Sequence, residues 1–227
     1  MSVGDRTERK TVGDRTETRR LEVENSDSQT ESKEVSFEEA CKDKVGQFVV
    51  LSDSMLRGII SKLARDNPIF TGKAIGGAKI EDIKQEIVSG RVRVVGKHAV
   101  LCVGTNNLQV DGSEIMLSKY RELFESLRAK DCKRVSIVGV FFRSDVSDYL
   151  DSKRVSVNLR LSELCSEFGY ICICPRALLG KLSISENTTV SDVRHRILNR
   201  SGLHFNEWGQ SKLARLVFQR CVKYLNL

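Results

Sequence analysis

Short apolar runs alternate with longer segments of helical spacing from residue 46 onward, and this alternation limits the possible folds more than any other feature. The apolar runs are rich in β-branched and aromatic residues, as in buried strands; they occupy residues 46–51, 68–70, 98–103, 135–141 and 170–175. Apolar residues recur at helical spacing, which predicts helices, in the segments 55–64, 80–88, 115–127, 155–168 and 206–225. Residues 91–95 suit either a short extra strand or an extended loop.

Strands that are separated by helices of ten or more residues indicate right-handed crossovers between parallel strands. A parallel sheet is buried on both faces, so helices must cover each of them. The sequence therefore predicts an α/β fold: a three-layer α/β/α sandwich around a mainly parallel five-stranded sheet. Residues 176–203 are expected to form a long loop before the last helix.

The first 40 residues differ in composition from the rest of the chain. Residues 1–35 contain only six apolar side chains, and the sequence Val-Gly-Asp-Arg-Thr-Glu at residues 3–8 recurs nine residues later, at 12–17. Burying so few apolar groups cannot offset the entropy of ordering the backbone, about 1–2 kcal/mol per residue. We expect a disordered polar tail over 1–40, with a short docking repeat as the alternative, and one domain over 41–227.

Charge is also distributed unevenly. Residues 1–40 hold 7 Lys or Arg and 11 Asp or Glu, whereas residues 41–227 hold 30 basic and 19 acidic side chains, a net charge of +11. A domain this basic could bind nucleic acid, an anionic membrane surface or an acidic substrate, or could simply present a solvated cationic surface. Nucleic acid therefore stays open as a partner, and the sequence does not indicate an oligomeric state.

Several classes of protein are excluded by what the sequence lacks. No apolar run approaches the roughly 18 residues needed to cross a bilayer, and the first 25 residues contain no signal-peptide core. The seven Cys, an odd number, are interpreted as reduced thiols. Cys172 and Cys174 would share one face of a strand, which favours buried thiols over a metal or redox site. We expect an intracellular, cytoplasmic protein with no membrane span, no metal and no cofactor.

Four polar positions follow predicted strands or precede the last helix: Ser54, Gly77, Asn106 and His204. Ligands of an open parallel sheet bind beyond the carboxyl ends of its strands, so these residues should meet at one edge. A Ser hydroxyl needs a base, which His can supply, and an oxyanion needs preorganised donors such as a Gly N–H and an Asn amide. Each residue alone is usually a helix cap, a turn or a surface residue. Together they predict acyl transfer on a small ester.

At these positions the sequence resembles the SGNH hydrolases, also called the GDSL esterase/lipase family, over about residues 46–220. Ser52-Asp53-Ser54 is similar to the first block of the family, normally Gly-Asp-Ser, and Gly76-Gly77-Ala78 to the second. Gly104-Thr105-Asn106-Asn107 resembles the third block, Gly-X-Asn-Asp, and Ser201-Gly202-Leu203-His204 the last, Asp-X-X-His. In style the chain is most similar to esterase-type domains of animal genomes, some of them carried in the first reading frame of LINE-type retroelements.

The resemblance implies a flavodoxin-like sandwich that hydrolyses esters of acyl or acetyl groups. It implies Ser54 as the nucleophile, His204 as the base, and Gly77 and Asn106 as the oxyanion donors. It also implies that the acid of a catalytic triad should stand at Ser201.

The chain departs from the family pattern at three positions: Ser52 replaces Gly, Asn107 replaces Asp, and Ser201 replaces the acid. Ser201 could accept a hydrogen bond from the imidazole but carries no charge, and loss of the acid in serine proteases costs about 10⁴ in kcat. Asp192 and Glu207 are the substitutes nearest His204 in sequence. Two hypotheses follow: a serine esterase working through a Ser-His dyad or degraded triad, and a weakened or inactive binding module that contacts nucleic acid through its basic surface.

Overall fold

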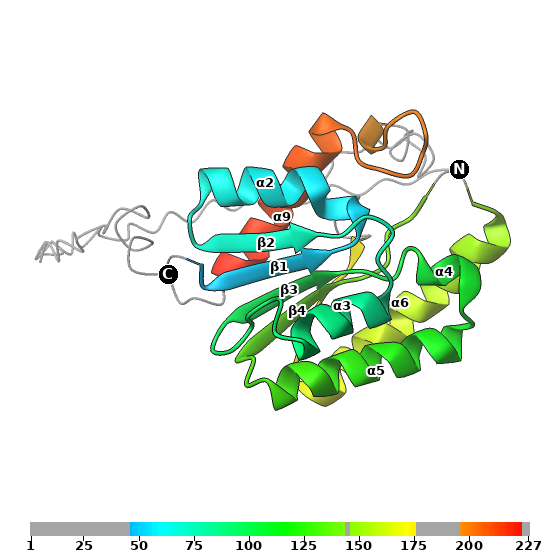
Figure 1. Cartoon of the computed structure of the whole chain (residues 1–227). Coiled ribbons are helices and arrows are strands. Elements are labelled where there is room, and N and C mark those ends of the chain that lie inside the picture. Colours follow the sequence, from blue (N-terminus) through cyan, green and yellow to red (C-terminus); the bar gives the residue numbers. More distant parts are fainter. Residues whose placement is uncertain (1–45, 144–145, 176–195, 224–227) are drawn as a thin grey trace, which may run out of the picture. The chain divides into compact units, whose positions relative to one another are not determined.

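Five strands form one sheet in the computed structural model, which describes residues 46–143, 146–175 and 196–223 (Figure 1). Four of them overlap the predicted apolar runs, whereas the second begins at Phe70, where the run 68–70 ends, and continues through exposed residues to Ala74. Among the described residues all strand pairs are parallel and the strand order is β2-β1-β3-β4-β5, which is the flavodoxin-like order. The predicted five-stranded parallel sheet is confirmed. The strands are β1 (Phe48–Ser52), β2 (Phe70–Ala74), β3 (His98–Cys102), β4 (Arg134–Val138) and β5 (Ile171–Ile173).

Helices cover both faces of the sheet, as the three-layer prediction requires (Figure 1). On one face, α2 (Arg57–Asp66) and α9 (Glu207–Val222) pack over an apolar core that includes Phe48, Val50 and Val100. On the other face, α3 (Ile80–Val88), α5 (Ser113–Ala129) and α6 (Asp148–Phe168) cover a second core around Leu51, Leu101 and Ile137. Neighbouring residues of each central strand thus point into different cores, which explains why β1 and β3 are buried throughout and apolar except at Ser52 and His98.

The ends of β4 and β5 differ from the prediction. The apolar run 135–141 leaves the ladder at Val138 because the Asn158 side chain binds the backbone of Val140, accepting from its N–H at 2.7 Å and donating to its C=O at 2.9 Å. β5 is only three residues long, so Cys174 lies beyond it and is exposed. The prediction that Cys174 is a buried thiol was wrong; Cys172 is half-buried against the second core.

Helix α6 begins seven residues before the predicted segment 155–168. Its first turns are polar and are held by Ser147 as the N-cap, by the Asp151–Arg154 ion pair and by Lys153 Nζ, which donates to the Leu108 carbonyl at 2.7 Å. Residues 91–95 form turns and not a strand.

The predicted tail, residues 1–40, lies outside the described residues, as does most of the predicted loop 176–203. Among the described residues, no helix combines the length and the apolarity that a membrane crossing requires.

Candidate active site at the carboxyl ends of the strands

Ser54 is held just beyond the carboxyl end of β1, at the right-hand end of the sheet in Figure 1. It is the first residue of a 3-10 turn, η1 (Ser54–Leu56), that runs directly into α2. Asp53 caps this turn, since its Oδ1 accepts from the Met55 N–H at 2.9 Å. The strand before it is completely buried, so the core fixes where the Ser54 hydroxyl stands.

His204 reaches Ser54 from a short segment that precedes α9. Its Nε2 lies 2.9 Å from Ser54 Oγ, although 150 positions separate the two residues in the sequence. The segment 196–206 folds back on itself through an antiparallel bridge between Leu198 and Phe205 and a 2.7 Å hydrogen bond from the Asn199 N–H to the His204 carbonyl. The structure therefore brings together the two residues that the sequence predicts as nucleophile and base.

The second ring nitrogen of His204, Nδ1, makes no hydrogen bond with any residue that the structure describes. Ser201 is exposed. Its hydroxyl donates to Asn199 Oδ1 at 2.7 Å and accepts from the Leu203 N–H at 3.4 Å, and it makes no hydrogen bond with the imidazole. Glu207 is 90% exposed and pairs with Lys62 at 3.7 Å. Asp192 lies outside the described residues.

The two predicted oxyanion donors occupy neighbouring loops. Gly77 has φ +72° in an exposed turn, and its N–H donates to no other described residue. Asn106 uses its Nδ2 to donate to the Ala78 carbonyl at 2.9 Å, which ties its loop to that of Gly77. An amide nitrogen carries two hydrogens, so the second remains available to a ligand.

Backbone hydrogen bonds hold the Ser54 loop between these two loops. The Asp53 N–H donates to the Cys102 carbonyl at 3.1 Å, and the Ile75 N–H donates to the Ser52 carbonyl at 2.8 Å. The loops that follow β2, β1 and β3 are thus joined side by side at one edge. This arrangement can offer a hydroxyl, an imidazole and two N–H donors to one bound molecule.

Asn107, where the family has Asp, is explained by its neighbours. Its Oδ1 accepts from the Ile80 N–H at the start of α3, and its Nδ2 donates to Glu81 at 3.0 Å and to Asp111 at 2.5 Å. Lys119 binds the same two carboxylates. A third carboxylate between Glu81 and Asp111 would be repelled, so the amide is the side chain that fits.

Two buried charged residues beneath Ser54 escaped the sequence analysis as site residues: Asp53 and Arg143, which are 0% and 7% exposed. Burial raises the pKa of Asp53 to about 6, while the Met55 N–H, Thr105 and the Arg143 charge each lower it by less. Asp53 Oδ2 has no hydrogen-bond partner among the described residues. The only signal in the sequence was the acidic residue directly before Ser54; nothing marked Arg143.

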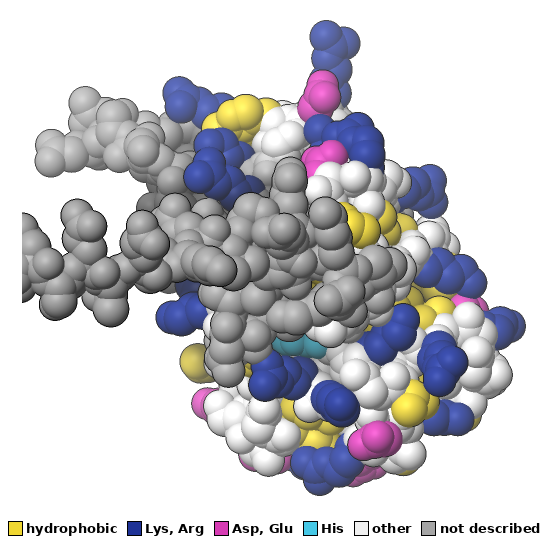
Figure 2. Space-filling model, turned by 90° about the vertical axis from the view of Figure 1, so that its left-hand side faces the viewer, with side chains coloured by type: hydrophobic (Ala, Val, Ile, Leu, Met, Phe, Trp, Pro, Cys, Tyr) yellow, Lys and Arg dark blue, Asp and Glu magenta, His cyan; other side chains and the backbone are white. Residues whose placement is uncertain are grey.

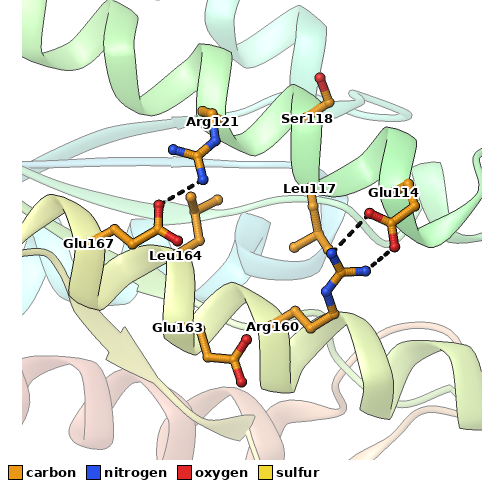
Figure 3. A pocket seen from close by; sticks show the side chains of 8 residues that line it. All are labelled: Glu114, Leu117, Ser118, Arg121, Arg160, Glu163, Leu164 and Glu167. Atoms are coloured by element: carbon orange, nitrogen blue, oxygen red, sulfur yellow. Dashed lines mark hydrogen bonds and ion pairs between the residues drawn. The ribbon is translucent and has the colours of Figure 1, made fainter.

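A separate pocket of about 320 Å³ lies between α5 and α6, away from Ser54 (Figure 3). Its lining charges form ion pairs across the two helices, Arg121 with Glu167 at 2.7 Å and Arg160 with Glu114. Glu163 also lines the pocket and takes part in neither pair (Figure 3). Since four of the five charged side chains pair across the helices, we interpret the pocket as the seam between two packed helices.

The described fold matches several solved structures of hydrolases. A member of the lipolytic G-D-S-L family from Veillonella parvula matches with a TM-score of 0.63 at 19% identity, over 76% of this chain and 96% of that one. A GDSL-like lipase from Bacteroides thetaiotaomicron matches at 0.60 and 13% identity, covering 78% and 88%. An acetylxylan esterase from Geobacillus stearothermophilus matches at 0.56 and 12%, covering 78% and 95%.

No protein-family model matches the sequence, and a search of curated proteins finds no relative. At these identities the likeness concerns the fold, which is that of the GDSL-type hydrolases. The similarity to retroelement-associated variants stays a prediction.

Proposed function

We propose that this chain, which has the fold of GDSL-type hydrolases, is a serine ester hydrolase with Ser54 as nucleophile and His204 as general base. The observation that carries the proposal is the 2.9 Å separation of Ser54 Oγ and His204 Nε2. This is the hydrogen-bonded pair that an activated Ser requires. The titles of the matching structures, a lipolytic protein, a lipase and an acetylxylan esterase, support ester substrates.

The reaction follows from the geometry. The Ser54 hydroxyl donates its proton to Nε2 as its oxygen bonds to the ester carbonyl carbon, and the carbonyl electrons move to the oxygen. The Gly77 N–H and the free Asn106 N–H stabilise this oxyanion. When the carbonyl re-forms, the alcohol leaves with the proton from His204. A water molecule then gives a proton to the same imidazole as its oxygen bonds to the acyl carbon. The bond from Ser54 Oγ to that carbon breaks, the imidazolium returns the proton to Ser54 Oγ, and a carboxylic acid leaves.

The rate that we expect depends on His204 Nδ1, which has no hydrogen-bond partner among the described residues. A carboxylate at that nitrogen orients the ring and stabilises its positive charge, and its loss lowers kcat about 10⁴-fold in serine proteases. Since no described residue supplies one, we infer slow turnover of small esters by a Ser54–His204 dyad.

A fluorophosphonate probe tests this proposal, because it reacts covalently only with an activated Ser. We expect labelling at Ser54, with loss of both labelling and p-nitrophenyl acetate hydrolysis in Ser54→Ala. Ser201→Ala is the matched control, since Ser201 is exposed and bonds Asn199. Equal labelling or equal hydrolysis by wild type and Ser54→Ala would overturn the enzyme assignment.

The second candidate function is a binding module on the same fold. It is favoured because no described residue is a hydrogen-bond partner of His204 Nδ1. A module of this kind would bind an ester in the cradle of Gly77 and Asn106 without turning it over. Binding of a non-hydrolysable ester analogue that is weakened by Asn106→Ala, together with no probe labelling, would distinguish it from the hydrolase.

A further inference from the structure

Two neighbouring segments at the opposite edge of the sheet, where the strands begin, carry a concentration of cations. Residues 91–97, between α3 and β3, contain three Lys or Arg and no acid, and residues 128–134, from the end of α5 into β4, contain four and a single acid. These fourteen residues hold a net charge of +6, and the whole chain holds +7. The seven cations are Arg91, Arg93, Lys97, Arg128, Lys130, Lys133 and Arg134.

The two segments form one surface, which we call the basic edge. The Gly96 N–H donates to the Asp131 carbonyl at 3.0 Å, and Cys132 Sγ donates to the Lys97 carbonyl at 3.4 Å. The strands that follow them, β3 and β4, pair in parallel and lie about 5 Å apart. Figure 2 looks onto this side of the molecule: Lys and Arg spread over its uncovered part, with few Asp or Glu between them.

Four of these cations have no carboxylate partner within the described part of the chain: Arg93, Lys97, Lys130 and Lys133. By contrast, the cations of the α5–α6 seam are paired. The negative end of the α5 dipole accounts for cations at 128 and 130. It does not account for Arg93 and Lys97, which lie in a different loop.

The field of the basic edge extends into the core. His98 opens β3, 6% exposed, and its Nε2 lies 2.8 Å from Ser136 Oγ. Burial, and next the charge of Arg134, lower the pKa of His98 to about 4. The ring is therefore neutral at pH 7 and reports on the nearby positive charge.

We propose that the basic edge binds the phosphate backbone of nucleic acid, without reading its sequence. Arg93 is one of the four cations without a carboxylate partner in the described part of the chain, and its guanidinium can hold two phosphate oxygens at once; the three Lys act as point charges. A membrane-docking surface would also need apolar side chains to insert, and these segments expose a single large one, Val95. The site lies at the other edge of the sheet from Ser54, so this proposal does not depend on the hydrolase assignment.

Binding of a labelled single-stranded RNA to the full-length chain, followed by fluorescence anisotropy over a range of salt, tests the proposal. The variant is Arg93→Gln, Lys97→Gln, Lys133→Gln, and the matched control removes three exposed cations elsewhere: Arg200→Gln, Lys212→Gln, Arg215→Gln. If each edge cation neutralises one phosphate, the slope of log K against log salt should flatten by about 2. The affinity loss between about 50 and 200 mM salt should then shrink about 20-fold. The control should keep the wild-type slope, and the edge variant should keep wild-type ester hydrolysis.

A second measurement uses the wild-type chain alone. Saturating RNA should raise the pKa of His98, followed by NMR of its ring protons, because phosphates would neutralise the nearby Arg134. If the slope of log K against log salt flattens equally in the edge variant and in the control variant, binding depends only on net charge and the proposal is overturned. Absence of RNA binding at low salt would also overturn it. So would binding to phosphatidylserine vesicles that RNA cannot displace, since the edge would then be a membrane surface.

Discussion

The half of the candidate site that carries Ser54, which we call the inner half, is built into the sheet, whereas the half that carries His204, the outer half, lies outside it. Ser52 and Asp53 are fully buried, and backbone bonds join their loop to the loops of both neighbouring strands. His204 depends on the segment 196–206, which is held by one antiparallel bridge and a few local hydrogen bonds. Its apolar anchors are Ile197, Leu198 and Phe205, all buried in the first core.

This difference shows that the fold stabilises the position of the nucleophile more strongly than that of the base. The position of the nucleophile is stabilised by the same apolar contacts that stabilise the protein, so it can shift only if the core shifts. The position of the base depends both on three apolar anchors in the core and on local polar contacts within 196–206, and a sequence change can remove the polar contacts without unfolding the domain. The half that carries His204 is also the half in which no described residue supplies the acid.

The largest expected effect comes from breaking the outer half completely. His204→Ala removes the only acceptor for the Ser54 proton among the described residues. We expect ester hydrolysis to fall about 10²-fold, because the effects of the base and of the acid that orients it are not additive, with the free energy of unfolding little changed. Arg200→Ala, an exposed change in the same segment, is the control. Activity of His204→Ala above a tenth of wild type would show that another group acts as the base.

A pH dependence of the free energy of unfolding should identify the contribution of Asp53 to the inner half. Its pKa is about 6 in the folded protein against 3.8 in the unfolded chain, so between these values the folded state binds more protons. The free energy of unfolding should therefore fall as pH rises from about 4 to 6, by roughly 3 kcal/mol for this group. Urea unfolding of wild type and Asp53→Asn across this range measures the difference. A parallel pH dependence in both proteins would rule out Asp53 as its source.

Replacing Asn107 by Asp, the residue that the family carries there, should lower the free energy of unfolding through the inner half. Asn107→Asp would place a third carboxylate between Glu81 and Asp111 and would remove two hydrogen-bond donors. We expect a loss of about 2 kcal/mol in the free energy of unfolding, measured by urea denaturation. Adding Glu81→Gln, which replaces one of the repelling carboxylates by an amide, should recover part of it. Wild-type stability of Asn107→Asp would contradict the network described here.

The inner half is also the half that the sequence could predict. Apolar runs locate the strands because burial on both faces demands them, and the carboxyl ends of parallel strands share one edge whatever the side chains. Those two rules were sufficient to bring Ser54, Gly77 and Asn106 to neighbouring loops. The motif spacing supplied His204.

The features that could not be predicted depend on polar contacts, both local and between distant segments, which the spacing of apolar residues does not reveal. The first turns of α6 have no apolar stripe and are held by capping and ion pairs, so periodicity missed them. Nothing local in the sequence reveals that Asn158 replaces the ladder of β4, or that Arg143 lies buried beside Asp53. The hydroxyl of Ser201 points to Asn199 because residues 199–204 form a turn, and no residue pattern in the sequence specifies the geometry of that turn.

The smallest effect on ester hydrolysis is expected when a carboxylate is introduced at Ser201, since no described residue supplies one to His204. Ser201→Asp puts a carboxylate at the position where the family carries one, but Asn199 Oδ1 now occupies the partner position of that side chain. Charge near the imidazolium should still help, so we expect hydrolysis to rise by no more than about tenfold, against the roughly 10⁴-fold effect of a fully oriented acid.

Ser201→Asn, similar in size and uncharged, is the matched control for Ser201→Asp. A gain shared by both would be a packing effect of the segment 196–206. A gain confined to the carboxylate and lost on protonation at low pH would identify the charge as its cause. A rise in ester hydrolysis far above tenfold would mean that a single carboxylate restores the function of His204 as a base. The local contacts that hold the segment 196–206 would then not limit the rate.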